Sequence, residues 1–226
     1  MKSFFITGTD TGIGKTLVSR LMIEYFAAQG NKVSGFKPVA SGAEDTGQGL
    51  RNEDAEILLA ASNAGFSYSE INPYVFAKPI APHIAAKQTG KIVNIPQLTQ
   101  HYQKLERQCD GVIIEGAGGW QVPLNEELTF ADWVSDMQWP VVMVVGLRLG
   151  CINHALLSYR DILTKGNIVA GWVANCIDEN VAEIEEIKSY LRGNIDAPML
   201  GDIPYLSQCN LSGAEKYVDF SLLLTD

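Results

Sequence analysis

The stretch GTDTGIGKT, residues 8–16, decides the fold class of this chain of 226 residues. It follows a short apolar run, residues 4–7, that is typical of a β-strand, and it precedes an amphipathic run, residues 15–29, that is typical of a helix. A glycine-rich loop in this position can turn its backbone N–H groups inward on phosphate oxygens. The loop departs from the standard pattern G-x-x-x-x-G-K-[ST], because Thr9 stands where the first glycine belongs. We therefore predict a specialised phosphate-binding loop; the alternative is a glycine-rich turn followed by a chance Lys-Thr pair.

Apolar runs of strand length recur along the chain and alternate with longer amphipathic runs. The predicted strands cover residues 4–7, 32–37, 111–115, 141–145, 168–174 and 199–203, and the predicted helices cover residues 15–29, 53–62, 96–108, 152–164 and 182–192. This alternation indicates βαβ units, and the nearly continuous apolar strands indicate a sheet that is covered on both faces. We expect residues 1–226 to form a single α/β domain of the P-loop NTPase type, doubly wound around a mostly parallel sheet. Residues 42–49 (GAEDTGQG) are predicted to be a loop.

The composition narrows the possible classes of function. The net charge of −9 argues against a general affinity for nucleic acid or for anionic membranes, which favour basic patches. No run approaches the roughly 18 apolar residues of a membrane-spanning helix, and the N-terminus does not resemble a signal peptide. The cysteines lie far apart, at positions 109, 151, 176 and 209, and together with three scattered histidines they predict reduced thiols rather than a zinc site. We therefore expect a cytoplasmic protein that binds neither membrane nor nucleic acid.

Several polar side chains near predicted strand ends are candidates for chemistry on a phosphate. Lys15 can place a positive charge on the outer phosphates, and Thr16 can offer its hydroxyl to Mg²⁺. Glu115 ends a predicted strand and precedes three glycines, which favours a metal ligand; the alternative is an ordinary surface glutamate. Lys37 ends another predicted strand and can neutralise charge on a transferred phosphoryl group; the alternative is a solvated lysine. The acids of RNEDAE, residues 51–56, are not distinguished from one another by pattern alone.

Over nearly its whole length the sequence resembles the dethiobiotin synthetase family of biotin biosynthesis. The motifs that carry the resemblance are TGTDTGIGKT (7–16), KPVASG (37–42), LRNEDA (50–55), NPYVF (72–76), EGAGGW (115–120), FADWV (130–134), LGCINHALL (149–157), GWVAN (171–175) and GDIPYL (201–206). In this family the first loop glycine stands one residue earlier than in the standard pattern, as Gly8 does here. The match is least secure from Ser207 onward.

The resemblance implies an ATP- and Mg²⁺-dependent cyclo-ligase. Its substrates would be 7,8-diaminononanoate, CO₂ (or bicarbonate) and ATP, and its products would be dethiobiotin, ADP and phosphate. The reaction would pass through an N-carbamate and a carbamic–phosphoric anhydride. The working unit would be a homodimer with its active sites at the subunit interface.

The resemblance also implies roles for individual residues. The catalytic residues would be Lys37, Lys15 and Thr11, and the metal ligands would be Thr16, Asp54 and Glu115. The nucleotide would be bound by the loop, by the two metal-binding acids, by the turn that follows Glu115 and by two later segments: Gly12, Ile13, Gly14, Lys15, Thr16, Leu17, Asp54, Glu115, Gly116, Ala117, Gly118, Asn175, Cys176, Pro204, Tyr205 and Leu206. The diamine would be bound by Ser41 and, from the partner subunit, by Gly150, Cys151, Ile152 and Asn153.

The sequence departs from the family at two positions and leaves rival functions to consider. Several members carry glutamate where this chain has Gly12, and a tryptophan can occur where it has Tyr205. The main rival is a nucleotide-switch ATPase of the partitioning or iron-protein type, which shares the fold and a modified loop. Such proteins usually carry a further lysine near the start of the loop, and residues 9–11 offer none. A small-molecule kinase would share the phosphate chemistry, but KPVASG and EGAGGW together favour the ligase.

Overall fold

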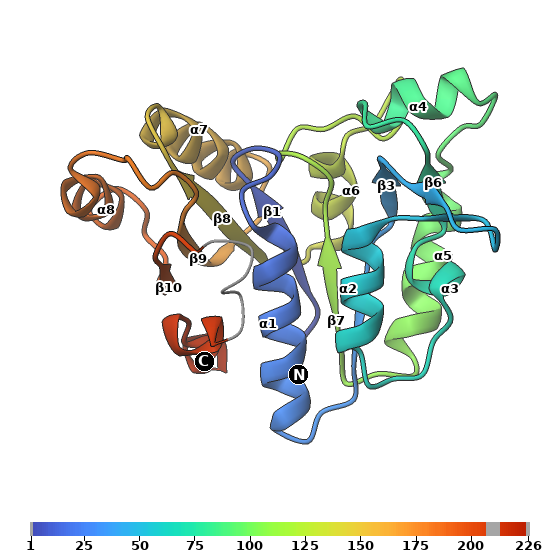
Figure 1. Cartoon of the computed structure of the whole chain (residues 1–226), viewed down its shortest axis with the longest axis horizontal. Coiled ribbons are helices and arrows are strands. Elements are labelled where there is room, and N and C mark those ends of the chain that lie inside the picture. Colours follow the sequence, from blue (N-terminus) through green and yellow to red (C-terminus); the bar gives the residue numbers. More distant parts are fainter. Residues whose placement is uncertain (1, 207–212, 225–226) are drawn as a thin grey trace.

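The computed structural model describes residues 2–206 and 213–224, and within them six parallel strands form a central sheet (Figure 1). The strands are β1 (Phe4–Gly8), β2 (Val33–Phe36), β7 (Gly111–Glu115), β8 (Val141–Leu147), β9 (Val169–Cys176) and β10 (Met199–Ile203). Their order across the sheet is β10-β9-β8-β1-β7-β2. All six predicted strands are therefore confirmed, and their ends lie within two residues of the prediction.

The five predicted helices are also present, as α1 (Lys15–Ala28), α2 (Glu53–Ala61), α5 (Ile95–Glu106), α7 (Cys151–Thr164) and α8 (Ile184–Arg192). The prediction missed α3 (Tyr68–Ile71), α4 (Pro82–Gln88), α6 (Phe130–Met137) and the 3₁₀ turns η2 (Ala214–Tyr217) and η3 (Phe220–Leu224). In the part of the chain that the structure describes, no helix is both long enough and apolar enough to cross a membrane.

Side chains alternate across the sheet and fill a core on each face. In β1, Phe4 and Ile6 pack with α1, whereas Phe5 packs with Trp120 and Phe130 on the other face. Figure 1 shows α1 and α2 in front of the sheet and α5, α6 and α7 behind it. Strands buried on both faces read as continuous apolar runs, which is why they could be recognised in the sequence.

Strand β1 lies at the centre of the sheet, between β7 and β8. The chain passes from β1 through α1 to β2, returns to β7, and then crosses to β8 on the other side of β1. In sheets of this kind, ligands bind beyond the carboxyl ends of the strands, where the strand order reverses. The carboxyl ends of β1 and β7 lie side by side there, since the N–H of Gly116 donates to the carbonyl of Ile6 in β1 at 3.1 Å. The topology therefore brings the predicted phosphate loop beside Glu115.

Two small two-stranded sheets are formed by the chain between β2 and β7, and one of them refines the prediction of a loop at residues 42–49. Residues 42–49 are not simply a loop, since β4 (Glu44–Asp45) pairs antiparallel with β5 (Leu50–Arg51). Between these strands, Gly47 and Gly49 have φ angles of 79° and 102°, which allows the tight reversal. Next to this hairpin, β3 (Val39–Ser41) pairs in parallel with β6 (Tyr74–Phe76). The predicted loop is therefore confirmed except at Glu44–Asp45, which form one strand of a short hairpin that leads into α2.

Candidate active site

The phosphate loop, residues 8–16, connects β1 to α1, and its shape depends on glycine and on a side chain from β9. Gly14 has a φ angle of 91°, in the left-handed region that favours glycine. A Cβ atom on Gly14 would lie 2.2 Å from Nδ2 of Asn175. That same Nδ2 donates a hydrogen bond of 2.8 Å to the carbonyl oxygen of Ile13. Glycine is therefore required at position 14, and the end of β9 braces the loop.

Lys15 is buried, with 6% of its surface exposed, although it carries an ammonium group. Its Nζ donates to the backbone oxygen of Asp10 at 2.8 Å. Burial, and then the charge of Lys37, lower the pKa of Lys15 to about 8, although nearby carboxylates oppose the shift. The side chain of Asp10 accepts the N–H of Thr11 at 2.7 Å and pairs with Arg148, which follows β8. The backbone of the loop itself therefore supplies the oxygen that contacts the Lys15 ammonium.

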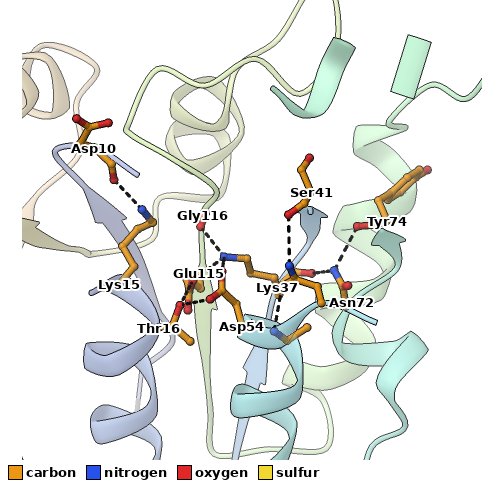
Figure 2. Close-up of polar contacts among 12 residues, drawn as sticks. Asp10, Lys15, Thr16, Lys37, Ser41, Asp54, Asn72, Tyr74, Glu115 and Gly116 are labelled. Atoms are coloured by element: carbon orange, nitrogen blue, oxygen red, sulfur yellow. Dashed lines mark hydrogen bonds and ion pairs between the residues drawn. The ribbon is translucent and has the colours of Figure 1, made fainter. Parts of the chain in front are cut away.

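Two carboxylates from different elements meet the hydroxyl of Thr16 (Figure 2). Thr16 Oγ1 lies 2.7 Å from Oδ1 of Asp54, on α2, and 3.0 Å from Oε1 of Glu115, at the end of β7. A hydroxyl has one proton, so it donates to one of these oxygens at a time. Glu115 is fully buried, and its second carboxylate oxygen, Oε2, has no hydrogen-bond partner among the described residues. The alternative of an ordinary surface glutamate is therefore excluded.

Lys37 lies between these carboxylates, directly after β2. Its Nζ is 2.5 Å from Oε1 of Glu115, 3.0 Å from Oδ2 of Asp54 and 3.2 Å from the carbonyl oxygen of Gly116. Only 3% of the residue is exposed, so the alternative of a solvated lysine is wrong. We call Thr16, Lys37, Asp54 and Glu115 the carboxylate cluster.

The contacts within the carboxylate cluster determine its charges. Burial alone would lower the pKa of Lys37, but the carboxylates of Glu115 and Asp54 outweigh burial and raise its pKa above the ordinary value. Burial also opposes ionisation of Asp54, but Lys37 and the Thr16 hydroxyl outweigh it and lower the pKa of Asp54. Lys37 is therefore protonated and Asp54 ionised at neutral pH.

The backbone of Lys37 is fixed by residues that the sequence reading did not assign to the site. Nδ2 of Asn72 donates to the carbonyl of Lys37 at 2.7 Å (Figure 2). The N–H of Lys37 donates to the carbonyl of Ile71 at 2.9 Å. The hydroxyl of Tyr68 in turn donates to Oδ1 of Asn72 at 2.9 Å. The motif NPYVF contains Asn72, but no local pattern shows that its amide meets a residue 35 positions earlier.

A cavity of about 560 Å³ opens between the phosphate loop and the carboxylate cluster. Predicted site residues line much of it: Thr11, Gly12, Ile13, Gly14, Lys15, Thr16, Lys37, Ser41, Asp54, Glu115, Ala117 and Gly118. The remaining lining residues were not predicted from the sequence; one is polar, Asn52, and the others are apolar: Pro79, Ile80, Ala81, Pro82 and Val122. Oγ of Ser41 is buried and has no partner among the described residues. The structure therefore brings the predicted phosphate and metal residues together on one cavity.

Other predicted residues do not line this cavity. The carbonyl of Gly116 contacts Lys37, and Leu17 packs against the core on the α1 face. Cys176 and the segment with Pro204, Tyr205 and Leu206 follow or end the neighbouring strands β9 and β10, and Tyr205 is 45% exposed. Gly150, Cys151, Ile152 and Asn153 form the start of α7, where Gly150 has a φ angle of 89°. None of these residues lines the cavity, so their roles in binding nucleotide or diamine remain predictions.

Taken together, the fold and the site define a P-loop nucleotide-binding protein. A family model described as an AAA domain matches residues 2–211. The signal recognition particle 54 kDa protein from Aeropyrum pernix K1, solved in complex with GDP, is similar in fold, with a TM-score of 0.51 and 15% sequence identity. That match covers 98% of this chain, which spans 44% of the other protein.

Curated relatives narrow this class to one family. The ATP-dependent dethiobiotin synthetase BioD of Yersinia pestis bv. Antiqua (strain Angola) is 48% identical over 206 residues, which cover 91% of this chain and 86% of the relative. The ATP-dependent dethiobiotin synthetase BioD 1 of Escherichia coli (strain K12) is 44% identical over 223 residues, which cover 98% of this chain and 99% of the relative. The chain therefore belongs to the ATP-dependent dethiobiotin synthetase family, and the resemblance seen in the sequence is confirmed.

Proposed function

We propose that this protein closes the ureido ring of dethiobiotin from 7,8-diaminononanoate and CO₂ at the expense of ATP. Its dethiobiotin synthetase activity follows from relatives that are 44% and 48% identical over nearly the whole chain. The observation that carries the proposal is the convergence of the phosphate loop, Lys37 and Glu115 on one cavity at the carboxyl ends of β1 and β7. A binding module without chemistry would not need these charged groups side by side.

The reaction proceeds in three balanced steps. One amine of the diamine adds to CO₂ and loses a proton, which gives a carbamate. A carbamate oxygen then attacks the γ-phosphorus of ATP, ADP leaves, and a carbamic–phosphoric anhydride forms. The second amine attacks the anhydride carbon and loses a proton, phosphate leaves, and the ring is closed. ATP thereby converts a poor leaving oxygen into phosphate, and the site holds the second amine against the activated carbon.

The residues around the cavity have matching roles in these steps. The N–H groups of residues 12–17 bind the phosphates of ATP at the start of α1. Lys15 and Lys37 supply positive charge as the γ-phosphoryl group is transferred. Thr11 and Ser41 contact the carbamate and diamine, and the buried Oγ of Ser41 supports this role because it has no partner among the described residues.

The base of the nucleotide would lie at the ends of β9 and β10. Asn175 keeps one N–H on the carbonyl of Ile13, which leaves a second N–H and an oxygen for the edge of a purine. Tyr205 offers an exposed aromatic ring two residues after Ile203, which pairs with Asn175. Cys176, Pro204 and Leu206 complete the proposed base-binding segments.

The residues present fit a Mg²⁺ ion, which Thr16, Asp54 and Glu115 would hold. All three offer the hard oxygen ligands that Mg²⁺ prefers, and the unpartnered Oε2 of Glu115 is a further buried acceptor. Within residues 2–206 and 213–224, no group of three or more His, Cys, Asp or Glu side chains is placed to hold a metal, so phosphate oxygens would complete the ligand set. The ion would neutralise charge on the phosphates during transfer.

We further propose a cytoplasmic homodimer whose subunits are single P-loop domains. Gly150, Cys151, Ile152 and Asn153 of one subunit would bind the substrate carboxylate in the site of the other. These residues begin α7, where the N–H groups of Ile152 and Asn153 have no acceptor within the helix and suit an anion, whereas the N–H of Cys151 donates to the carbonyl of Arg148 at 3.0 Å. The four residues lie outside the cavity of their own subunit. Next to them, Leu149 is 98% exposed and Leu157 is 59% exposed, which a subunit contact would cover.

The experiment is a phosphate-release assay with Mg·ATP and bicarbonate, with and without 7,8-diaminononanoate, in which dethiobiotin is detected by mass. We expect phosphate to depend on the diamine and to match dethiobiotin mole for mole. Phosphate released at the same rate without diamine, and no dethiobiotin, would contradict the proposal and favour a nucleotide-switch ATPase.

A further inference from the structure

Lys37 makes contacts in the carboxylate cluster that a bound metal cation would otherwise make. Its ammonium has three N–H groups, and three protein oxygens accept them: Oε1 of Glu115 at 2.5 Å, Oδ2 of Asp54 at 3.0 Å and the carbonyl of Gly116 at 3.2 Å (Figure 2). The side chain of Lys37 is only 4% exposed. In this arrangement, Lys37 has no N–H group left for a phosphate oxygen.

The two carboxylates need a cation beside them. The side chain of Glu115 is 0% exposed, and a buried carboxylate without a partner is strongly unfavourable. Among the described residues, Lys37 is the only cation in ion-pair contact with either Asp54 or Glu115. Lys37 therefore holds together two acids that come from α2 and β7, which lie far apart in the sequence.

The same two carboxylates and the Thr16 hydroxyl are the proposed ligands of Mg²⁺. A divalent ion carries twice the charge of an ammonium group, and oxygen ligands from phosphates complete its coordination. An ion that arrived with a nucleotide would therefore compete with Lys37 for the oxygens of Asp54 and Glu115. The phosphates that enter the cavity at the same time attract the released ammonium.

We propose that Lys37 holds Asp54 and Glu115 in place before Mg·ATP arrives, and that metal binding then releases the lysine to the γ-phosphate. This inference rests on the proposed Mg²⁺ site. The lysine and the metal compete for the same oxygens, so Lys37 reaches the phosphates only when the metal is in place. Without a nucleotide, the competition weakens metal binding.

Lys15 provides a matched control for this competition. It is also a buried lysine of the same cavity, but its Nζ donates to the backbone oxygen of Asp10. Its charge lowers the pKa of Asp54, but among the described residues no hydrogen bond joins the two side chains. Replacing Lys15 removes a nearby charge but breaks no hydrogen bond that Asp54 or Glu115 makes among the described residues.

The test is a titration of nucleotide-free protein with Mn²⁺, which can replace Mg²⁺ and is detected by electron paramagnetic resonance. We expect Lys37→Met to bind Mn²⁺ at least about ten-fold more tightly than the wild type, and Lys15→Met to differ by about three-fold at most. Equal affinities for the wild type and Lys37→Met would overturn the proposal. The proposal would also be overturned if Lys37→Met and Lys15→Met gained the same Mn²⁺ affinity. It would be overturned likewise if neither variant nor the wild type bound Mn²⁺ measurably.

A second set of measurements tests the proposal even if Lys37→Met does not fold without metal. If that variant is unfolded without metal, Mg²⁺ is expected to restore its far-UV circular dichroism, and failure to do so contradicts the proposal. Lys37→Arg keeps the positive charge, so we expect its Mn²⁺ affinity to stay within about three-fold of the wild type; a ten-fold gain would overturn the competition. Dethiobiotin formation by the wild type is measured separately, so a failure of the proposed function is distinguishable from a failure of this inference.

Discussion

The carboxyl end of the sheet has two unlike halves, one around β1 and β7 and the other around β9 and β10. In the first half, Lys37 and Glu115 are almost wholly buried and are joined to each other by hydrogen bonds. In the second half, Pro204 and Tyr205 are exposed, and Asn175 spends one donor on the phosphate loop. Burial therefore pre-organises the groups around Lys37 and Glu115, whereas the side proposed to bind the base is exposed at Pro204 and Tyr205 although Asn175 and Cys176 are buried.

The largest expected effect lies in the buried half. Replacing Lys37 by alanine removes a charge that the account assigns to the phosphoryl transfer, so we expect turnover to fall by about a hundred-fold or more. The Kd for ATP, measured by titration calorimetry, should change only slightly. Lys91→Ala, at an exposed lysine, is the matched control and should leave both quantities unchanged. Normal turnover in Lys37→Ala would remove this residue from the mechanism.

The next effect lies where the two halves meet. Asn175→Ala removes the donor to the carbonyl of Ile13 and a proposed contact to the base, so we expect the Kd for ATP to rise by about ten-fold or more. Asn194→Ala is the control, because the amide of Asn194 also donates to a carbonyl, that of Tyr190, but at an exposed site that does not line the cavity. An unchanged Kd for ATP in Asn175→Ala would show that Asn175, at the end of β9, does not contribute to nucleotide binding.

A smaller effect is expected from the charge state of Lys15. Because the pKa of Lys15 is lowered to about 8, the free protein loses this charge as the pH rises through that value. Phosphate binding favours the charged form, so the affinity for ATP should fall several-fold between about pH 7.5 and pH 9.5. The dependence should be lost in Lys15→Met. The same slope in the wild type and the variant would assign the titration to another group.

The smallest effect concerns the stability of the phosphate loop. Gly12 has a φ angle of 70°, although a Cβ atom there would meet nothing within 4 Å. Gly12→Ala should therefore lower the free energy of unfolding by about 1 kcal/mol through backbone strain alone. Gly193→Ala is the control, since Gly193 has a φ angle of −77° and its nearest contacts lie at an ordinary 3.7 Å. Equal changes in the melting temperatures of the two variants would show that the loop relaxes.

The same contrast explains how far the sequence predicts the fold. The buried strands and the phosphate loop depend on local patterns, and they were predicted to within two residues. Helix α4 has only seven residues and shows little periodicity, so it was missed. Helix α6 was missed although Thr129 and Asp132 form a capping box at its start, a signal that the sequence does contain.

Site residues that belong to a sequence motif could be predicted, whereas residues placed by hydrogen bonds between distant parts of the chain could not. Pattern alone could not choose among the acids of α2, and the resemblance selected Asp54. The structure gives the physical reason: Asp54 faces Thr16, whereas Glu56 bonds to Arg51 at 3.1 Å. Asn52 and Asn72 were not assigned to the site, because their amides bond to backbone oxygens that lie 11 and 35 positions away. Such pairings depend on tertiary structure and leave no local pattern.

The most direct test of the proposed reaction follows an oxygen atom from CO₂ to phosphate. The protein is mixed with C¹⁸O₂, Mg·ATP and 7,8-diaminononanoate in a rapid single-turnover experiment, and the released phosphate is analysed by mass spectrometry. If a carbamate oxygen attacks the γ-phosphorus, each phosphate carries one ¹⁸O and dethiobiotin keeps the other in its ureido carbonyl. Unlabelled phosphate formed together with dethiobiotin would contradict the anhydride and the role given to the site.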